Sequence, residues 1–456
     1  MRRTDFSQQV ETTPSTPETP KDIVSTTESP RLTPADVLGV FPEESGLTET
    51  GELTIGGCSV SQLAEEFGTP AYVVDEQGLR RQVRRFVDGL ASRWPRSTVL
   101  FASKSLPAVA MYAIAQSEGL GVDVAGGGEL MMALAAGVDP ARIYMHGNAK
   151  SDAEIDMALQ AGIRCIIVDN LDELARLEAL TTRPQSVMIR LTPGIDPRTH
   201  ASQATGGTDS KFGLPREQVE LAAKRIAAHP FLSLEGIHVH IGSQVLETEP
   251  FADAVKTVAD LGPFETYDIG GGLGVQYTED QPAPSVEQYL DAVVDAARAH
   301  LPAGARLIIE PGRSLVARAG VSLYRVNAVK HTGKTFVAVD GGMADNLDIA
   351  LTGQRYHAVV ATTMDRVPDT VCDVVGRQCE SGDLMVGGAK LVDPKVGDLV
   401  VIPVTGAYSY TMANHYNGAP IPPIVFCADG KASLAARRET YEDMLQTHQP
   451  AFTRQW

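Results

Sequence analysis

Polar side chains stand repeatedly where apolar, strand-like runs of the chain end. The run "TVLFAS" at residues 98–103 leads directly to Lys104. Other runs carry groups that can bear a charge or move a proton at their ends: Asp123, His146, Asp169, Arg190, His240 and Glu310. A single lysine at the end of a strand most often marks the surface. The repetition instead predicts that these groups converge on one site.

The glycine-rich segment "DIGGGLG" at residues 268–274 is the most informative single motif. Glycines such as Gly271 and Gly272 let backbone N–H groups approach phosphate oxygens closely. The alternative interpretation is a tight turn between a strand and a helix. The segment is not a G-x-G-x-x-G motif after a first strand, so a dinucleotide-binding fold is disfavoured.

A lysine and a phosphate site in one cavity point to a specific cofactor. Removal from water favours the neutral amine of a lysine, and a neutral amine can react with an aldehyde. Pyridoxal phosphate carries both an aldehyde and a phosphate. Its ring needs a flat group on one face and a partner for its nitrogen, and His240 and Glu310 stand on either side of the glycines. We therefore expect Lys104 to hold pyridoxal phosphate.

Eight short apolar runs, separated by helical stretches, would bring these groups together. The runs lie at residues 98–103, 121–124, 142–146, 164–168, 186–191, 236–240, 266–269 and 306–310. This alternation predicts a (β/α)8 TIM barrel, whose active site lies at the carboxyl ends of the strands. We assign residues 46–320 to this pyridoxal-phosphate-binding domain, including a strand at 71–75 and a helix at 76–90 that precede the eight runs.

The chain changes character on both sides of the predicted barrel. After residue 320, strands are predicted at 321–329, 334–340, 370–376, 397–404 and 423–430, followed by a helix at 432–445. We assign residues 321–456 to a separate β-rich domain. Residues 1–45 are rich in Thr, Ser, Pro and Glu and cannot bury enough apolar surface to offset the entropy lost on ordering. This segment is predicted to be a disordered tail, with a docking segment as the alternative.

Composition excludes several classes of partner. The 456 residues carry a formal net charge of −18, which disfavours binding to nucleic acid or to anionic membranes. No apolar run is long enough to span a membrane. The five cysteines show no metal-ligand spacing, so we expect no metal site and a reducing, cytoplasmic location.

Several motifs together resemble one family, the diaminopimelate decarboxylases, within the alanine-racemase-like class of pyridoxal-phosphate enzymes. They lie between about residue 50 and residue 445: "FASKS", "GVDVAGGGEL", "HGNAKS", "TDSKFGLP", "HVHIGSQ", "DIGGGLG", "EPGRSLVA", "VDGGMADN", "CESGD" and "GAYSYTMANHYN". The resemblance implies an α/β fold, in which a barrel of the alanine-racemase type precedes a C-terminal β-barrel domain. It also implies an amino-acid decarboxylase, a carboxy-lyase of amino-acid biosynthesis.

The resemblance implies roles for the matching cofactor residues. Lys104 would hold the cofactor covalently, His240 would stack on its ring, Glu310 would pair with the ring nitrogen and Asp123 would lie near the ring. The phosphate would be held by four residues: Ser243, Gly271, Gly272 and Tyr408.

The resemblance also implies substrate contacts and a partner. Arg313 would bind a substrate carboxylate, Cys379 would return a proton to the decarboxylated carbon, and Glu380 would contact the substrate. In this family the last two residues come from the second subunit, so a homodimer with shared active sites is implied. The alternative for Cys379 is a small buried apolar residue.

The chain departs from the family pattern at the place that binds the distal carboxylate of the substrate. The family usually shows "DNPRPALYG", whereas this chain reads "DNLDIALTG", with Asp348 at the arginine position and Thr352 at the tyrosine position. An arginine fork suits a carboxylate, and an aspartate repels one. Arg355 stands three residues further on and is a candidate replacement. Ala149 also stands where a second asparagine is common.

Four functions therefore compete. The first is a decarboxylase acting on a related amino acid, such as a conjugate or one linked to a carrier protein, because Asp348 and Thr352 alter the distal clamp. The second is a true meso-diaminopimelate decarboxylase of lysine biosynthesis. An amino-acid racemase and a cofactor-binding non-enzyme are the others; Glu310 and "CESGD" disfavour the racemase, and the complete set of Lys104, Glu310 and Cys379 disfavours a non-enzyme.

Overall fold

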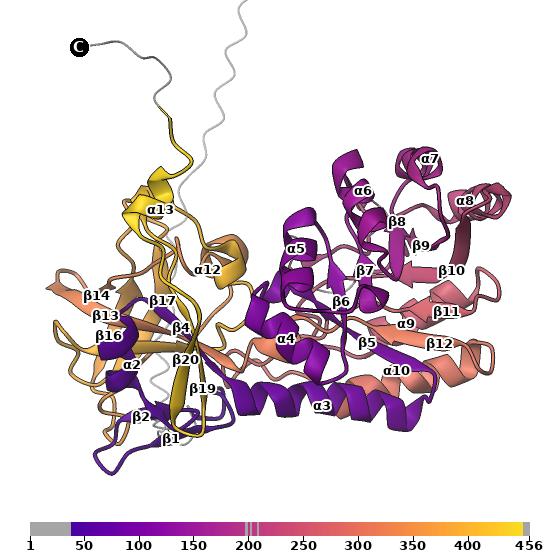
Figure 1. Ribbon diagram of the computed structural model, residues 1–456. Coiled ribbons are helices and arrows are strands. Elements are labelled where there is room, and N and C mark those ends of the chain that lie inside the picture. Colours follow the sequence, from indigo (N-terminus) through magenta and orange to yellow (C-terminus); the bar gives the residue numbers. More distant parts are fainter. Residues whose placement is uncertain (1–37, 197–198, 201–202, 208, 450–456) are drawn as a thin grey trace, which may run out of the picture.

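Eight parallel strands form a closed barrel in the computed structural model, which describes residues 38–196, 199–200, 203–207 and 209–449 (Figure 1). The strands follow the eight predicted runs: β5 (Ser97–Ala102), β6 (Gly121–Val124), β7 (Ile143–Met145), β8 (Cys165–Val168), β9 (Gln185–Leu191), β10 (Leu232–Val239), β11 (Thr266–Asp268) and β12 (Arg306–Ile309). Pairing of β12 with β5 closes the ring. The predicted barrel is therefore confirmed.

Helices cover the outside of the barrel and connect its strands. They are α3 (Glu76–Arg93), α4 (Val109–Ser117), α5 (Gly127–Ala135), α6 (Asp152–Ala161), α7 (Leu171–Leu180), α8 (Arg216–Ala228), α9 (Glu249–Ala259) and α10 (Val286–His300), with the short α11 (Arg313–Val316) after β12. Local sequence explains their ends. In α6 the Ser151 side chain and Glu154 form a capping box, and Gly162 ends the helix with φ of 66°.

The barrel interior has an apolar floor and a polar mouth. Six buried side chains from the strands form a cluster separate from the main core: Leu100, Tyr144, Cys165, Ile167, Met188 and Ile308. The charged residues follow at the carboxyl ends of the strands. This layering leaves the lower barrel filled with apolar side chains and confines polar chemistry to one end.

The second domain is a nine-stranded mixed sheet (Figure 1). Its strands are β4 (Ala71–Asp75), β13 (Gly320–His331), β14 (Thr335–Val339), β15 (Val359–Val360), β16 (Thr370–Val375), β17 (Leu384–Leu391), β18 (Leu399–Pro403), β19 (Ile424–Ala428) and β20 (Lys431–Ala436). The long strand β13 pairs with β4, β14 and β18. The β-rich domain is thus present, and its hydrogen-bonded strands form a branched sheet rather than a closed ring.

Strand β4 does not belong to the barrel domain in which the sequence placed it. It lies between β13 and β19, where Val73 is opposite Val321 and Val425. All five of its residues are buried, so its composition indicates a buried strand without indicating which sheet contains it. Only the long-range pairing decides that, and the helix α3 then carries the chain from the sheet to the barrel (Figure 1).

Two predictions near the chain ends also differ from the structure. Residues 432–436 form most of β20, which pairs with β19, and the predicted helix is reduced to α13 (Tyr441–Leu445). The predicted tail falls mainly on residues 1–37, which lie outside the described residues. Within its last part, Val40 and Phe41 are buried against the core. The small sheet of β1 (Ser45–Leu47), β2 (Leu53–Ile55) and β3 (Cys58–Ser59) and the helix α2 (Val60–Phe67) follow directly.

Among the described helices, none has both the length and the apolar character needed to cross a membrane.

A buried ion pair fixes the loop that follows β7. The Lys150 Nζ lies 3.0 Å from Glu173 Oε1, and both side chains are almost fully shielded from solvent. The same ammonium donates hydrogen bonds to the backbone oxygens of Gly147 and Ile167, at 2.7 and 2.8 Å. Because this loop begins at His146, the ion pair holds one side of the barrel mouth in place.

Loss of this pair should destabilise the protein. Glu173→Gln leaves the Lys150 ammonium buried without a counter-charge, and we expect the free energy of unfolding to fall by about 3 kcal/mol. The matched control is Glu220→Gln, which breaks an exposed pair with Lys224 and should change stability by less than about 0.5 kcal/mol. Urea unfolding followed by circular dichroism measures both. Equal stability of the two variants would contradict a supporting role for Glu173.

Candidate active site

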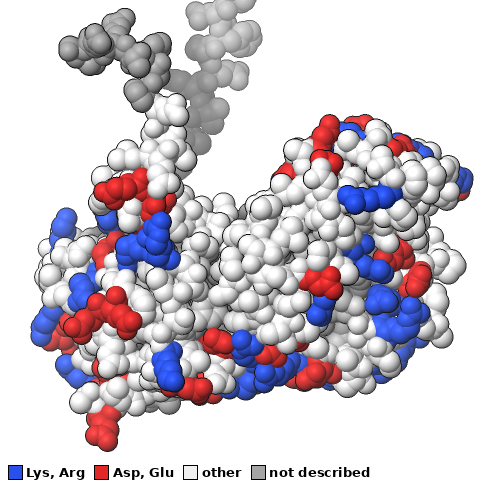
Figure 2. Space-filling view, viewed as in Figure 1, with Lys and Arg blue, Asp and Glu red and all other residues white. Residues whose placement is uncertain are grey.

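A cavity of about 380 Å³ opens at the carboxyl ends of the barrel strands, where the second domain faces the barrel mouth. Its lining includes most of the predicted site residues: Lys104, His240, Ser243, Gly272, Glu310, Arg313, Asp348, Thr352 and Tyr408. It also includes His146 and Arg190, which were expected at the site without a specific role, and His238, which the sequence analysis did not single out. Figure 2 shows a hollow between the two domains on this face, with few charged side chains on its surface.

Lys104 is presented to the cavity by a single tight turn. Strand β5 ends at Ala102, and a 3-10 turn over Ser103–Ser105 follows. The flanking serines are buried while the Lys104 side chain projects into the open cavity. The backbone N–H of Tyr408, from the second domain, donates to the Ser105 oxygen at 2.9 Å. The lysine turn is therefore held from both domains.

The protonation state of Lys104 differs from the expectation that a shielded lysine is neutral. Removal from bulk water would by itself lower the pKa of Lys104. The negative charge of Asp123, together with Tyr408 and Glu310, outweighs this effect, and the pKa is raised above its usual value. Without a ligand, the lysine is thus an ammonium group that faces the acidic side chains of the barrel mouth.

Glu310 lies at the centre of these acidic side chains. Its Oε1 is 2.8 Å from His146 Nε2, and its Oε2 is 3.4 Å from His238 Nε2. Burial alone would raise the pKa of Glu310, but the two imidazoles hold it well below its usual range. The neighbouring Asp268 behaves in the opposite way, because burial and the charge of Glu310 raise its pKa well above normal. Glu310 is therefore the ionised member of this group.

His146, His238, Asp268 and Glu310 each offer one potential metal-ligand atom within 4.8 Å of the others. The sequence spacing did not reveal this group, because its members come from four different strand ends. Within the group, the two imidazoles lie against the Glu310 carboxylate, at 2.8 and 3.4 Å. In addition, Asp123 Oδ1 lies 3.8 Å from His146 Nε2, so Asp123 reaches the cavity only through His146 and the field it exerts on Lys104.

His240 is held as a neutral ring beside the glycine segment. The Gly271 N–H donates to His240 Nδ1 at 3.1 Å, which leaves Nδ1 unprotonated. Burial lowers the pKa of His240 well below its usual value. The Gly271 amide already donates to His240, and the phosphate contact expected of Gly271 stays a prediction.

Three further lining residues suit a phosphate. Gly272 lines the cavity with φ of 120°, and a Cβ at this position would lie 2.3 Å from the Gly242 oxygen, so only glycine fits. Ser243 and Tyr408 also line the cavity. Tyr408 adopts φ of 61°, a left-handed conformation that a tyrosine rarely takes. Together with Lys104 and Glu310, these residues fit the aldehyde, phosphate and ring nitrogen of pyridoxal phosphate.

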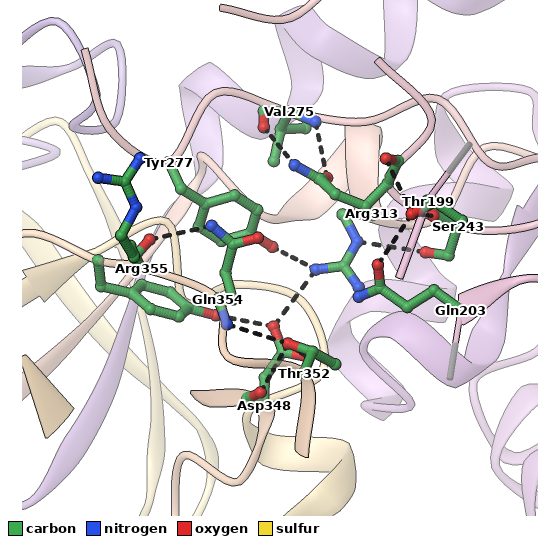
Figure 3. Close-up of polar contacts among 12 residues, drawn as sticks. Thr199, Gln203, Ser243, Val275, Tyr277, Arg313, Asp348, Thr352, Gln354 and Arg355 are labelled. Carbon is green, nitrogen blue, oxygen red and sulfur yellow. Dashed lines mark hydrogen bonds and ion pairs between the residues drawn. The ribbon is translucent and has the colours of Figure 1, made fainter. Parts of the chain in front are cut away.

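Arg313 already has an internal carboxylate partner, as Figure 3 shows. Its Nη1 lies 3.5 Å from Asp348 Oδ2 and also donates to the Tyr277 hydroxyl, and its Nε donates to Ser243 Oγ at 3.3 Å. Asp348 begins the short helix α12 (Asp348–Thr352), where the Thr352 hydroxyl donates to its Oδ1 at 3.3 Å. The altered residues of the distal clamp are thus neighbours of Arg313, as their positions in the motif implied.

Arg355 does not replace the missing clamp in this structure. Its Nη2 lies 2.7 Å from Asp280 Oδ2, and both side chains are more than 60% exposed. Figure 3 shows its side chain directed away from Arg313.

Cys379 and Glu380 lie outside the cavity lining within the described chain. They occupy the loop between β16 and β17, where the Cys379 N–H donates to Asn417 Oδ1 at 2.7 Å. The Cys379 side chain is an exposed free thiol. One chain therefore brings together the predicted cofactor residues but not the predicted proton donor.

The missed residues had a detectable signal. His238 precedes His240 by two residues, and alternate residues of a strand point to the same face. His146 was expected at the site without a role; it stands directly after β7, as Glu310 stands directly after β12. Tyr277 lies nine residues beyond β11, and nothing in the local sequence connects it to Arg313.

Comparison with known proteins agrees with this geometry. Residues 77–317 match the family described as "Pyridoxal-dependent decarboxylase, pyridoxal binding domain". The diaminopimelate decarboxylase of Bacillus subtilis is 40% identical over 423 residues, which cover 88% of this chain and 96% of the relative. The diaminopimelate decarboxylase of Actinosynnema pretiosum is 41% identical over 430 residues, covering 91% and 96%.

Solved structures give the same result. The diaminopimelate decarboxylase of M. jannaschii in complex with L-lysine superposes with a TM-score of 0.83 and 30% identity, covering 90% of this chain and 98% of that one. The chain therefore belongs to the pyridoxal-dependent decarboxylases of the diaminopimelate decarboxylase family, and it is a carboxy-lyase that uses pyridoxal phosphate.

Proposed function

We propose that this enzyme removes the α-carboxylate of an amino acid in the cavity beside Lys104. The observation that carries the proposal is that Lys104 and Glu310 face one cavity whose lining also includes Ser243, Gly272 and Tyr408. Pyridoxal phosphate, when bound, supplies an electron sink for the charge left by departing CO2.

The residues of this chain then have separate tasks. Lys104 Nζ holds the cofactor covalently, and the ionised Glu310 keeps a proton on the ring nitrogen, which strengthens the electron sink. His240 is neutral and stacks on the ring. Ser243, Gly272 and Tyr408 hold the phosphate, while Gly271 and Asp123 act through His240 and Lys104 respectively.

The proton donor comes from a second copy of the chain in this proposal. Cys379 Sγ holds the proton that returns to the α-carbon, and Glu380 contacts the substrate. Both lie outside the cavity of their own chain, and Cys379 is exposed. A homodimer with shared active sites accounts for both facts.

The substrate is proposed to be an amino acid other than meso-diaminopimelate, either free or conjugated. Asp348 stands where the family pattern has an arginine, and it pairs with Arg313 at 3.5 Å. The alternative is diaminopimelate decarboxylation in lysine biosynthesis, which the names of the relatives favour. We also propose a cytoplasmic location, since all five cysteines are free thiols.

Covalent attachment of the cofactor tests the role of Lys104. Borohydride treatment of the purified protein should remove its visible absorbance and leave a phosphopyridoxyl mass on the peptide that contains Lys104. Because the pKa of Lys104 is raised, only a small fraction of the amine is neutral near pH 7. The rate at which the cofactor attaches to cofactor-free protein should therefore rise about tenfold for each unit of increase in pH, as long as the pH stays below that pKa. Lys211→Ala, at a lysine outside the cavity lining, should behave as wild type. An adduct in this cavity of Lys104→Ala protein would contradict the assignment.

Mixing inactive variants tests the shared site. Lys104→Ala and Cys379→Ala subunits should together recover about a quarter of wild-type activity, because half of the dimers are hybrids and each hybrid has one intact site. The control mixes Lys104→Ala with His240→Ala, whose altered residues belong to the same half-site, and should recover nothing. Equal recovery in both mixtures, or none in either despite subunit exchange shown by mass spectrometry, argues against sharing.

Diaminopimelate turnover tests the altered clamp. Loss of a charge-assisted bidentate contact costs about 1.5–3 kcal/mol, so kcat/KM for meso-diaminopimelate should lie about ten- to a hundredfold below that of the preferred substrate. Asp348→Arg combined with Thr352→Tyr should raise it. The measurement is CO2 release. Efficient diaminopimelate decarboxylation by the unaltered enzyme would favour the alternative function.

A further inference from the structure

The pair formed by Arg313 and Asp348 makes the distal end of the cavity electrically neutral. Both side chains line the cavity, and only 5% and 3% of their surfaces are exposed. Two tyrosines complete the arrangement. Tyr277 accepts from Arg313, and Tyr356 donates to Asp348 Oδ2 at 3.0 Å. The two tyrosine rings meet edge to face, with centroids 4.9 Å apart, and hold the pair from one side.

A charged substrate end is poorly matched to this pair. A distal carboxylate that approaches Arg313 also approaches the Asp348 carboxylate, and a distal ammonium that approaches Asp348 meets the Arg313 guanidinium. In either case one charge is left without a partner in a site shielded from water, which is costly. A neutral group avoids both penalties.

The pair also presents a hydrogen-bond donor beside an acceptor. Hydrogen bonds to described residues occupy Nε and Nη1 of Arg313, and none of these residues accepts from Nη2. Asp348 Oδ1 receives only the Thr352 hydroxyl, at 3.3 Å, among the same residues. A terminal carboxamide has a carbonyl oxygen and an N–H on one edge, so it can accept from Arg313 while it donates to Asp348. An alkyl end satisfies neither, and a hydroxyl can do both only through one oxygen, which must then lie within hydrogen-bond distance of both groups at once.

We propose that the substrate is an amino acid whose side chain ends in a carboxamide, read by Arg313 and Asp348 together. This inference rests on the proposed function, because the distal end of the amino acid must reach Arg313 while its α-carbon lies near Lys104. A site that hydrogen-bonds a buried polar group rejects analogues that lack it, since its own polar atoms are then unpaired. Asp348 is thus a specificity-determining residue that selects a neutral end.

The test compares distal groups at constant chain length. One set is glutamine, glutamate and ornithine, and further sets are one and two carbons longer. With the cofactor-loaded enzyme, the carboxamide member of the preferred set should exceed the carboxylate and ammonium members at least tenfold in kcat/KM for CO2 release. Analogues of the same sets without the α-amino group cannot react, and calorimetry should give their dissociation constants in the same order. N-methylated carboxamides separate a terminal amide from the amide of a conjugate, and we expect them to bind at least tenfold more weakly.

Two variants and two failures separate the inference from the proposed function. Asp348→Asn leaves Arg313 without its counter-charge and should transfer the preference to the carboxylate analogue by at least tenfold. Tyr356→Phe removes one hydrogen bond but no charge and should keep the wild-type order. The inference is overturned if the wild-type enzyme prefers a carboxylate or an ammonium end, or if calorimetry detects no binding of any analogue. Both outcomes are measured on the wild-type protein, so they do not depend on whether a variant folds. If no amino acid releases CO2 although the carboxamide analogue binds best, the proposed function fails, whereas recognition of a carboxamide by Arg313 and Asp348 stands.

Discussion

Burial of one ionised carboxylate, Glu310, is the constraint around which the site is built. Closing eight parallel strands into a ring brings their carboxyl ends together and excludes water between them, so a charge placed there must be compensated. The imidazoles of His146 and His238 lie 2.8 and 3.4 Å from the two Glu310 oxygens, and the pKa of Glu310 stays well below its usual range. The neighbouring Asp268 retains its proton, because burial and the charge of Glu310 raise its pKa. The barrel mouth therefore holds one carboxylate that stays ionised.

The second domain completes what the barrel cannot supply alone. Its backbone reaches the lysine turn through the hydrogen bond from Tyr408 to Ser105, and it places the Tyr408 ring against the Arg313 guanidinium, 4.6 Å from the ring centroid. The strand β4, which precedes the barrel in sequence, is part of the same sheet. The sheet of the second domain thus contains one strand from before the barrel and eight strands from after it. This shared sheet couples the two domains at the site.

Arg313 illustrates how one substitution changes the meaning of a retained residue. The motif "EPGR" is intact, yet its arginine is paired with Asp348 and surrounded by Tyr277 and Ser243. A guanidinium with an internal counter-charge offers directional hydrogen bonds but little net charge. In the proposed function, chemistry at the α-carbon and recognition at the distal end are therefore separable, because Lys104 and Glu310 are retained while Asp348 replaces an arginine.

The sequence alone determined the barrel, because apolar runs and helical stretches alternate eight times and each run ends on a polar group. It also identified Lys104, His240 and Glu310, since their positions after strands follow from that alternation. Tertiary structure decided the rest. The sheet that contains β4 depends on long-range pairing, the amide of Gly271 is taken by His240, and the charge of Lys104 reflects Asp123 rather than burial alone. In the sequence, Asp348 indicates only that the arginine of the family pattern is absent. In the folded chain it is the partner of Arg313, because the chain returns from the second domain to the barrel mouth thirty-five residues after Arg313.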